Sequence, residues 1–147
     1  MRGAIFLGLL TTWIGGLTGC GSRGGNLPRT VPAEGVVTLD GKPVEGAQVV
    51  LVPAGEAVTG AYGVTDARGR FSLRAFEQKE GAIPGDYLVQ VSKTIEVRLK
   101  GPPVDGGDPV RFEHGVPARY TNAQTSGLKV TIPDMGKKDI QLELKSK

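Results

Sequence analysis

Few side chains in this 147-residue chain are suited to catalysis. His114 is the only histidine, and a histidine that acts as a general base or metal ligand needs further polar partners. None of Ser72, Ser92 and Ser126 lies in the Gly-x-Ser-x-Gly sequence that exposes a nucleophilic serine on a sharp turn. We therefore expect His114 to be an exposed loop residue, and we expect no catalytic residues and no cofactor.

Carboxylates gather near one loop that is rich in glycine and proline. Asp105, Asp108 and Glu113 are close in sequence, and their hard oxygens are suitable ligands for Ca²⁺. The spacing does not match an EF-hand loop, so solvated turn side chains are the simpler interpretation and we expect no metal site. Asp40 and Asp66 have turn-forming roles that need no metal.

Carbohydrate binding would require aromatic side chains with exposed flat faces. Strand alternation assigns Phe71 and Tyr87 to the core. For Tyr62, Phe112 and Tyr120 we expect packing in the core or at its corners. A surface module for a glycan or Ca²⁺ stays open as the alternative to a structural or protein-interaction role.

The sole cysteine, Cys20, follows a segment typical of export signals. Met1 and Arg2 give a positively charged start, and the apolar stretch at 4–14 is shorter than the roughly 20 residues that cross a bilayer. It fits the h-region of a secretory signal peptide, about 7–15 residues long, so Trp13 would be removed on export. An ordinary signal peptide in which Cys20 is incidental is the alternative.

The tetrapeptide Leu17-Thr18-Gly19-Cys20 resembles the bacterial lipobox. The resemblance implies diacylglyceryl modification of the Cys20 thiol, cleavage after Gly19 and acylation of the new amino group, with palmitate among the chains. Each buried methylene contributes ~0.8 kcal/mol, so two or three chains hold a protein firmly on a membrane. By the same resemblance, Gly21 in place of aspartate favours the outer membrane.

Composition limits the remaining classes of protein. Without Arg2 the chain carries 17 basic and 15 acidic residues, a formal charge of +2, and no basic run resembles a nucleic-acid footprint. We therefore expect no nucleic-acid partner. The 23 glycines and 10 prolines have no collagen period and indicate the many tight turns of an all-β domain.

Period-two alternation after the signal predicts strands, and no segment has convincing helical periodicity. Residues 20–32 read as a lipidated cysteine with a flexible tether. The expected strands lie near 37–39, 47–53, 61–65, 70–74, 87–92, 128–132 and 140–144, with an edge piece at 42–44. About seven strands with frequent turns predict a two-sheet antiparallel β-sandwich.

Two turns and two irregular stretches are also expected. Asp40-Gly41 tolerates the positive φ of a tight hairpin, and Asp66 with Gly69 suits a type I turn. We expect residues 76–83 to form a loop or one helical turn. We expect 100–109 to be a long excursion and the better candidate for a contact surface, because binding concentrates on loops.

The order of the turn motifs resembles the carboxypeptidase regulatory-like domain of small bacterial lipoproteins. The similar segments are Gly35-Val36-Val37, Asp40-Gly41-Lys42-Pro43-Val44, Thr65-Asp66-Ala67-Arg68-Gly69-Arg70-Phe71, Pro84-Gly85-Asp86-Tyr87 and Val116-Pro117-Ala118-Arg119-Tyr120. The resemblance implies a transthyretin-like (prealbumin-like) sandwich over 33–147. It implies no activity, because these motifs are structural. A purine-pathway hydrolase shares the fold class, but its histidines and its Tyr-Arg-Gly-Ser signature are absent here.

Together these observations predict three parts: a signal peptide at 1–19, a lipidated tether at 20–32 and a β-sandwich at 33–147. The expected protein is a non-enzymatic lipoprotein that is exported and anchored to a bacterial membrane through Cys20. Its expected partners are that membrane and another envelope protein.

Overall fold

The computed structural model describes residues 27–55, 59–101 and 109–147. Strands make up almost all of the regular structure, and the described residues contain no α-helix. The elements in chain order are β1 (Ala33–Leu39), β2 (Lys42–Pro43), β3 (Gln48–Pro53), β4 (Ala61–Val64), β5 (Arg70–Ser72), β6 (Arg74–Phe76), β7 (Lys79–Glu80), β8 (Gly85–Ser92), β9 (Thr94–Arg98), β10 (Val110–His114), the 3₁₀ helix η1 (Ala118–Thr121), β11 (Lys129–Ile132) and β12 (Lys137–Leu144).

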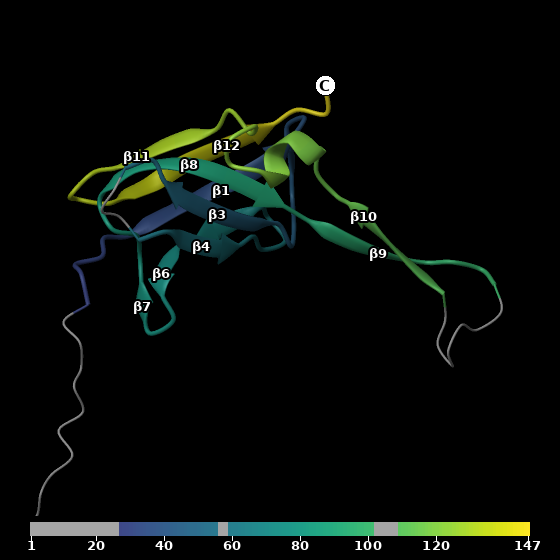
Figure 1. Ribbon diagram of the computed structural model, residues 1–147, viewed down its shortest axis with the longest axis horizontal. Coiled ribbons are helices and arrows are strands. Elements are labelled where there is room, and N and C mark those ends of the chain that lie inside the picture. The colour runs from purple at the N-terminus through teal and green to yellow at the C-terminus, as the bar shows by residue number, and fades with distance from the viewer. Residues whose placement is uncertain (1–26, 56–58, 102–108) are drawn as a thin grey trace, which may run out of the picture.

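Two sheets pack face to face and form a β-sandwich (Figure 1). The six-stranded sheet has the order β11-β8-β3-β4-β6-β7. In the four-stranded sheet, β12 lies on one side of β1, and β2 and β5 lie on the other side. A separate pair, β9 and β10, extends away from the sandwich. The expected all-β sandwich is thus confirmed.

The pairing of β1 with β12 is parallel, unlike the antiparallel pairing expected throughout. Gly35 lies opposite Ile140 and Leu39 lies opposite Leu144. A parallel pair needs a crossover between its strands, and here nearly the whole domain forms that crossover. Alternation within each strand shows which face is buried but not which strand lies alongside or in which direction, so the sequence pattern could not reveal this pair.

The core consists of alternating apolar side chains from both sheets. Each fully buried valine or leucine stabilises the fold by about 1.5–3 kcal/mol relative to exposure. The largest fully buried side chains are those of Tyr87, Leu51, Leu73, Ile132, Leu144, Val37, Val49, Val89 and Val91. The expected core positions of Phe71 and Tyr87 are confirmed, since both rings are almost completely buried.

Gly35 is the point of closest approach within the four-stranded sheet. A Cβ atom there would lie 2.3 Å from the Ile140 carbonyl oxygen and 2.7 Å from the Phe71 ring. The Phe71 ring occupies the space that a side chain at Gly35 would fill. This position therefore tolerates no side chain without movement of β5 or β12.

The two expected turns are present with their hydrogen bonds. Asp40 (φ 49°) and Gly41 (φ 80°) both have positive φ, as the tight β1–β2 hairpin requires. The Gly69 amide donates to the Asp66 carbonyl at 2.9 Å, which closes the type I turn. Backbone amides of Arg70 and then Arg68 donate to the Asp66 carboxylate and lower its pKa.

Two short hairpins were not anticipated as strands. Residues 76–83, expected to be a loop or a helical turn, contain parts of β6 and β7, which pair through Phe76 and Lys79. The segments beside the expected excursion form β9 and β10. These four extra strands of two to five residues, with the expected edge piece β2, raise the number of described strands from about seven to twelve. Such short strands carry little alternation, so the period gives a weak signal.

The sandwich begins earlier than the expected tether boundary at residue 32. Val31 is buried and exchanges two backbone hydrogen bonds with Ala82, at 2.8 and 2.9 Å. The Pro32 carbonyl accepts from the Lys137 amide at 2.8 Å. The last two tether residues are therefore part of the folded domain.

Two further expectations fall wholly or mostly on residues that the structure does not describe. The signal peptide at 1–19 and Cys20 lie outside the described residues, and so do residues 102–108 of the expected excursion. Within the described part, no helix has the length and apolarity needed to cross a membrane.

Replacing Gly35 by alanine tests the close approach of β1, β5 and β12. We expect Gly35→Ala to lower the free energy of unfolding by about 1–3 kcal/mol, because the new methyl group overpacks the core. Urea denaturation monitored by circular dichroism measures the change. Gly55→Ala is the matched control, because a Cβ at Gly55 meets no atom within 4 Å. Equal stability of the two variants would contradict the packing argument.

Candidate functional site

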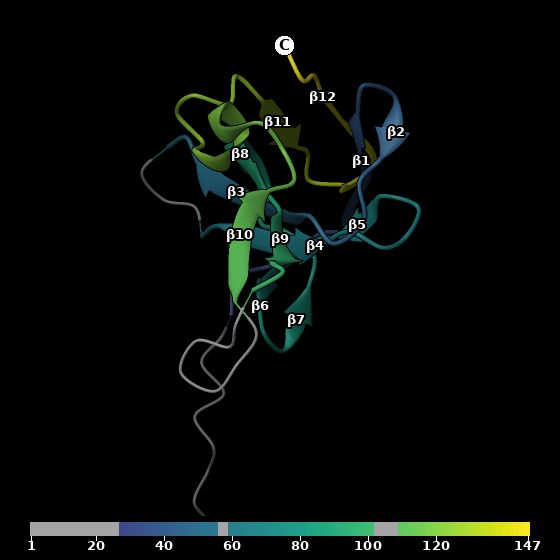
Figure 2. The ribbon, with the colours of Figure 1, turned by 90° about the vertical axis from the view of Figure 1, so that its right-hand side faces the viewer.

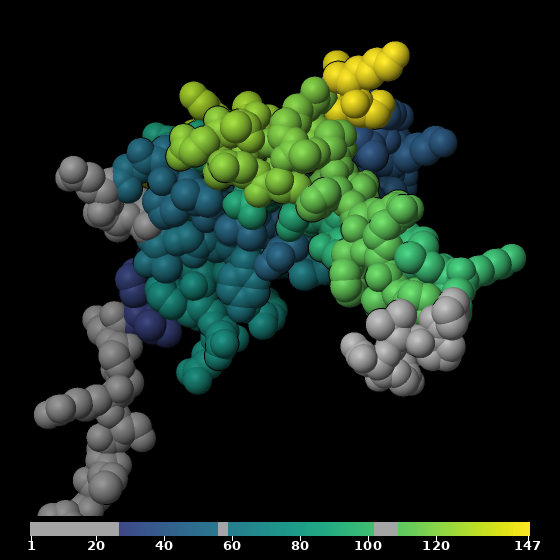
Figure 3. All heavy atoms as spheres, turned by 45° about the vertical axis from the view of Figure 1, so that its right-hand side comes forward, coloured from purple at the N-terminus to yellow at the C-terminus, as the bar shows by residue number. Residues whose placement is uncertain are grey.

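The β9–β10 pair, which we name the arm, is exposed at nine of its ten residues. Its strands pair antiparallel from Thr94 opposite His114 to Arg98 opposite Val110. Figure 1 shows the arm extending beyond one end of the sandwich, and the space-filling view shows it standing out from the body (Figure 3). The first described residues lie at the other end of the sandwich in Figure 1.

The two faces of the arm carry different side chains, because residues that pair across antiparallel strands share a face. Phe112 lies opposite Glu96, and this face also carries Val110 and His114. The second face carries Arg111 and Glu113 on β10, with Val97 opposite Arg111 and Ile95 opposite Glu113.

Apolar side chains on the arm are open to solvent. Phe112 is 65% exposed, and Ile95, Leu99 and Val110 are each 40–43% exposed. These side chains lie on both faces of the arm, with Phe112 and Val110 on one and Ile95 on the other. An isolated two-stranded hairpin is at best marginally stable in water, and exposed apolar surface is typical of interaction surfaces. The arm therefore has the character of a surface that another molecule covers.

One edge of β10 offers unpaired backbone groups. The Gly115 amide donates to the Lys93 carbonyl, and the Leu99 amide donates to the Pro109 carbonyl, both at 2.8 Å. In an antiparallel pair, residues that bond to the partner strand alternate with residues whose N–H and C=O groups point away from it. These two bonds fix that alternation, which we call the parity of the arm. Val110, Phe112 and His114 therefore direct their N–H and C=O groups away from β9. In Figure 2 no other strand lies along this outer edge of β10. The edge can accept an added strand.

Arg111 and Glu113 form an ion pair along β10. Their side chains are 62% and 46% exposed, so water screens the pair and its contribution to stability is small. The pair keeps both charges on one face of the arm. Each charge remains accessible to a further partner beside the strand.

The structure places His114 and the three serines considered in the sequence on separate elements. His114 is exposed as expected, but it lies on β10 and not in a loop. Ser126 is buried, donates to the Ala123 carbonyl and accepts from the Leu128 amide, both at 3.2 Å. Its hydroxyl therefore supports a turn. Ser72 is exposed on β5, and Ser92 is half-buried on β8.

The described residues do not bring together the carboxylates that were considered as Ca²⁺ ligands. Asp105 and Asp108 lie outside them, and Glu113 pairs with Arg111. Among residues 27–55, 59–101 and 109–147, no three His, Cys, Asp or Glu side chains are grouped as a metal site. Asp40 accepts hydrogen bonds from the hydroxyl and the amide of Ser146, which lower its pKa.

The three aromatic residues expected to pack inside divide into two groups. Tyr120 is buried as expected, and its hydroxyl accepts from the Lys145 amide at 3.0 Å. The prediction was wrong for Tyr62 and Phe112, which are 41% and 65% exposed. Both lie on strand faces that no second layer covers, and the sequence pattern does not identify which faces these are.

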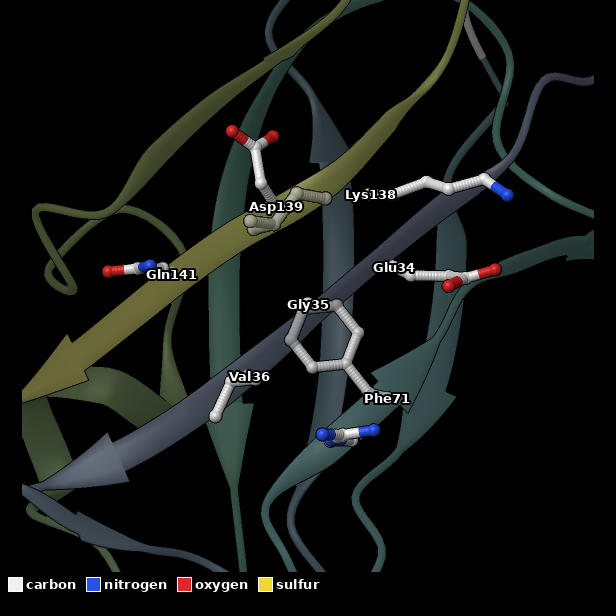
Figure 4. Close-up of a pocket in the computed structure, with 9 residues that line it drawn as sticks. Glu34, Gly35, Val36, Phe71, Lys138, Asp139 and Gln141 are labelled. Atoms are coloured by element: carbon white, nitrogen blue, oxygen red, sulfur yellow. The ribbon is translucent and has the colours of Figure 1, made fainter.

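A shallow depression of about 340 Å³ lies along β1 and β12 (Figure 4). Exposed charged residues line it, among them Glu34, Lys138 and Asp139. Figure 4 shows Glu34 and Lys138 pointing one way, and Asp139 and Gln141 pointing other ways. Acid–base catalysis requires groups within hydrogen-bond reach of one reacting atom. The lining residues do not converge in that manner.

Comparison with protein-family models found no match, and comparison with curated proteins found none. Among solved structures, the chain is similar to a 9R-lipoxygenase from Cyanothece PCC8801, with 15% sequence identity and a TM-score of 0.37. The match covers 79% of this chain and 16% of the lipoxygenase chain. A likeness at this TM-score carries no argument about fold or activity.

The sequence indicated the segment between the two strands of the arm but did not predict the arm itself. It indicated a contact surface at 100–109, of which residues 102–108 lie outside the described part of the chain. The exposed apolar residues of the arm, Ile95, Leu99, Val110 and Phe112, lie on either side of that segment. A signal was present, because Ile95, Val97 and Leu99 alternate with polar residues. Alternation predicts a strand, but it does not show that the strand projects away from the core.

Excising the arm tests whether it is separate from the folding unit. Lys93 and Gly115 form a hydrogen-bonded pair, which an Asn-Gly turn can close. We expect replacement of residues 94–114 by Asn-Gly to change the free energy of unfolding by less than about 1 kcal/mol. Phe71→Ala, measured alongside by urea denaturation, should cost about 3–5 kcal/mol because it empties the core. A comparable loss on arm excision would show that the arm is structural.

Proposed function

We propose that this chain is a non-enzymatic, lipid-anchored lipoprotein of the bacterial envelope whose β-sandwich presents the arm to a protein partner. The signal peptide at 1–19 directs export, and lipid on Cys20 holds the protein on a membrane. Its sandwich is a carboxypeptidase regulatory-like domain, a transthyretin-like fold. The outer membrane is the favoured location.

The observation that supports a lipid anchor is the position of the only cysteine. Cys20 stands directly after a short apolar stretch and the small residues of a lipobox-like tetrapeptide. A single acyl chain binds a membrane marginally, whereas two or three chains hold firmly. A lipid anchor of this kind needs no membrane-spanning segment in the mature protein.

The observation that supports a binding role is the exposed apolar surface of the arm. Phe112, Val110 and Ile95 are open to water on an element that contributes nothing to the sandwich core. Binding surfaces are commonly carried by exposed segments on a rigid scaffold. An anchored sandwich with a projecting arm is suited to contact with another protein.

Metabolic labelling with an alkyne-bearing palmitate analogue tests the anchor in a bacterium that exports the full-length chain. We expect the wild type to incorporate label and to lose residues 1–19. Cys20→Ala should incorporate no label, because it lacks the thiol that accepts the lipid. Ser22→Ala is the matched control and should be labelled like the wild type. An unlabelled wild type, or equal labelling of Cys20→Ala, would disprove the anchor.

Crosslinking in intact cells tests the binding role. We expect an amine-reactive crosslinker to join the lipidated wild type to one dominant protein, identified by mass spectrometry after purification under denaturing conditions. The variant with residues 94–114 replaced by Asn-Gly should lose that adduct while retaining palmitate label and stability. Retention of the adduct without the arm would contradict a binding role for the arm. Specific recovery on a polysaccharide resin or calcium-dependent thermal stabilisation would instead support a glycan- or Ca²⁺-binding module.

A further inference from the structure

We propose that the arm's partner is a second copy of this chain, bound by antiparallel pairing of β10 with β10 in a register centred on Phe112. The inference rests on the proposed binding role of the arm and identifies what the arm binds. Addition of a strand to an exposed edge supplies backbone hydrogen bonds, and the side chains beside that edge decide which strand fits.

Charge complementarity favours self-pairing. With Phe112 opposite Phe112 of the second copy, Arg111 of each chain lies opposite Glu113 of the other. The two strands then bring together four charges that alternate in sign around a square. Opposite charges directly across an antiparallel pair stabilise it, and like charges destabilise it. The five residues of β10 are therefore complementary to themselves when one copy is reversed.

The hydrogen-bonding parity of β10 agrees with this register. Val110, Phe112 and His114 direct their backbone groups away from β9, as the bonds at Leu99 and Gly115 establish. In the proposed register Phe112 pairs with Phe112, and Val110 pairs with His114 of the second copy. All three pairs join residues whose N–H and C=O groups face the new strand.

The same register places exposed aromatic side chains together at the centre of the interface. Phe112 is the most exposed aromatic side chain of the described structure, at 65%. In the four-stranded ribbon its ring lies beside the ring of the second copy, on the face that also carries Val110 of both chains. Paired aromatic side chains across strands stabilise antiparallel sheets.

The outer edge of β9 does not fit itself in the same manner. Its outward-directed residues are Thr94, Glu96 and Arg98, by the parity of the arm. The register of greatest overlap places Glu96 opposite Glu96 of a second copy, and like charges directly opposite are unfavourable. Self-association is therefore expected at β10.

The position of the arm permits this contact. The arm extends beyond the sandwich (Figures 1 and 3), so antiparallel arms can overlap while the two sandwiches lie at opposite ends of the ribbon. Lipid anchoring confines both copies to one surface and raises their effective concentration. A pairing of only five residues per strand thereby gains from attachment to the membrane.

Charge reversal with two differently tagged copies tests the proposal. The full-length proteins are co-expressed and exported, whole cells are lysed in a mild detergent, and recovery of one tag on the other is measured. We expect Arg111→Glu paired with itself, and Glu113→Arg paired with itself, to fall about tenfold or more below wild type, since each places two like-charged pairs in the interface. Arg111→Glu paired with Glu113→Arg should recover to near the wild-type level, because every cross-strand pair is again opposite in sign.

Both substitutions are at exposed positions, so the fold should be kept; equal thermal unfolding temperatures check this. Recovery of the mixed pair is an outcome that mere loss of folding cannot produce. Equal recovery of all combinations, no recovery for the wild type, or a mixed pair as weak as each variant alone would overturn the proposal.

A disulfide measures the register. A hydrogen-bonded antiparallel pair places Cα atoms about 5.5 Å apart, within the range that a disulfide spans. Phe112→Cys should give an oxidant-dependent dimer, whereas the matched Glu96→Cys, on the outer edge of β9, should give at least about fivefold less. With Cys20 lipidated, the introduced thiol is the only one. Equal dimer from both variants would contradict the β10 register.

These outcomes separate this inference from the proposed function. If palmitate labels Cys20 and the arm crosslinks to a different protein, the binding role stands and self-pairing fails. If the copies co-purify through β10 but no lipid is found, the anchor fails and self-pairing stands.

Discussion

The packing of β1 is the constraint on which the sandwich depends. This strand has neighbours along both edges, with β12 parallel on one side and the antiparallel β5 and β2 on the other. At Gly35 the neighbours come so close that the Phe71 ring fills the place of a side chain. Because protein interiors are packed to crystal density, the missing side chain is matched by an inserted ring. The first, the fifth and the last strand of the domain are joined at this one residue.

The arm obeys a different constraint. It lies outside the core, so no packing requirement explains why apolar residues at Phe112, Val110 and Ile95 face water. Folding of the sandwich gains little from them, and exposure of apolar surface favours association. The same absence of packing leaves the outer edge of β10 open, and an open edge is normally blocked by charge or covered. Arg111 and Glu113 place charges at this edge, but in an order that matches its own reversed copy.

An anchor at one end and an arm at the other define the proposed working arrangement. The described chain begins at the end of the sandwich opposite the arm (Figure 1). Lipid at Cys20 would hold the first end on the membrane, and with the long axis of each copy along that surface, the arms of two anchored copies would overlap. Confinement to a surface lets a small contact area act at low expression, because association then takes place at a raised local concentration.

The local conformation of the chain could be predicted from the amino-acid sequence alone. The all-β class, the buried alternation of β8 and β12, and the Asp40 and Asp66 turns follow from period-two patterning and from residues that tolerate particular φ values. These properties depend on residues only a few positions apart in the chain, so short stretches of sequence determine them. The absence of a Gly-x-Ser-x-Gly sequence and of a second histidine was equally visible.

Relations between distant segments were decided only in three dimensions. The parallel pairing of β1 with β12, the inclusion of Val31 in the sandwich and the projection of the arm all depend on which segments lie alongside one another. Alternation states that one face of a strand is apolar, but it does not state whether another layer covers that face. Phe71 and Phe112 both alternate with polar residues, and only the tertiary structure buries the first and exposes the second. The difference arises because burial is a property of the whole packed fold.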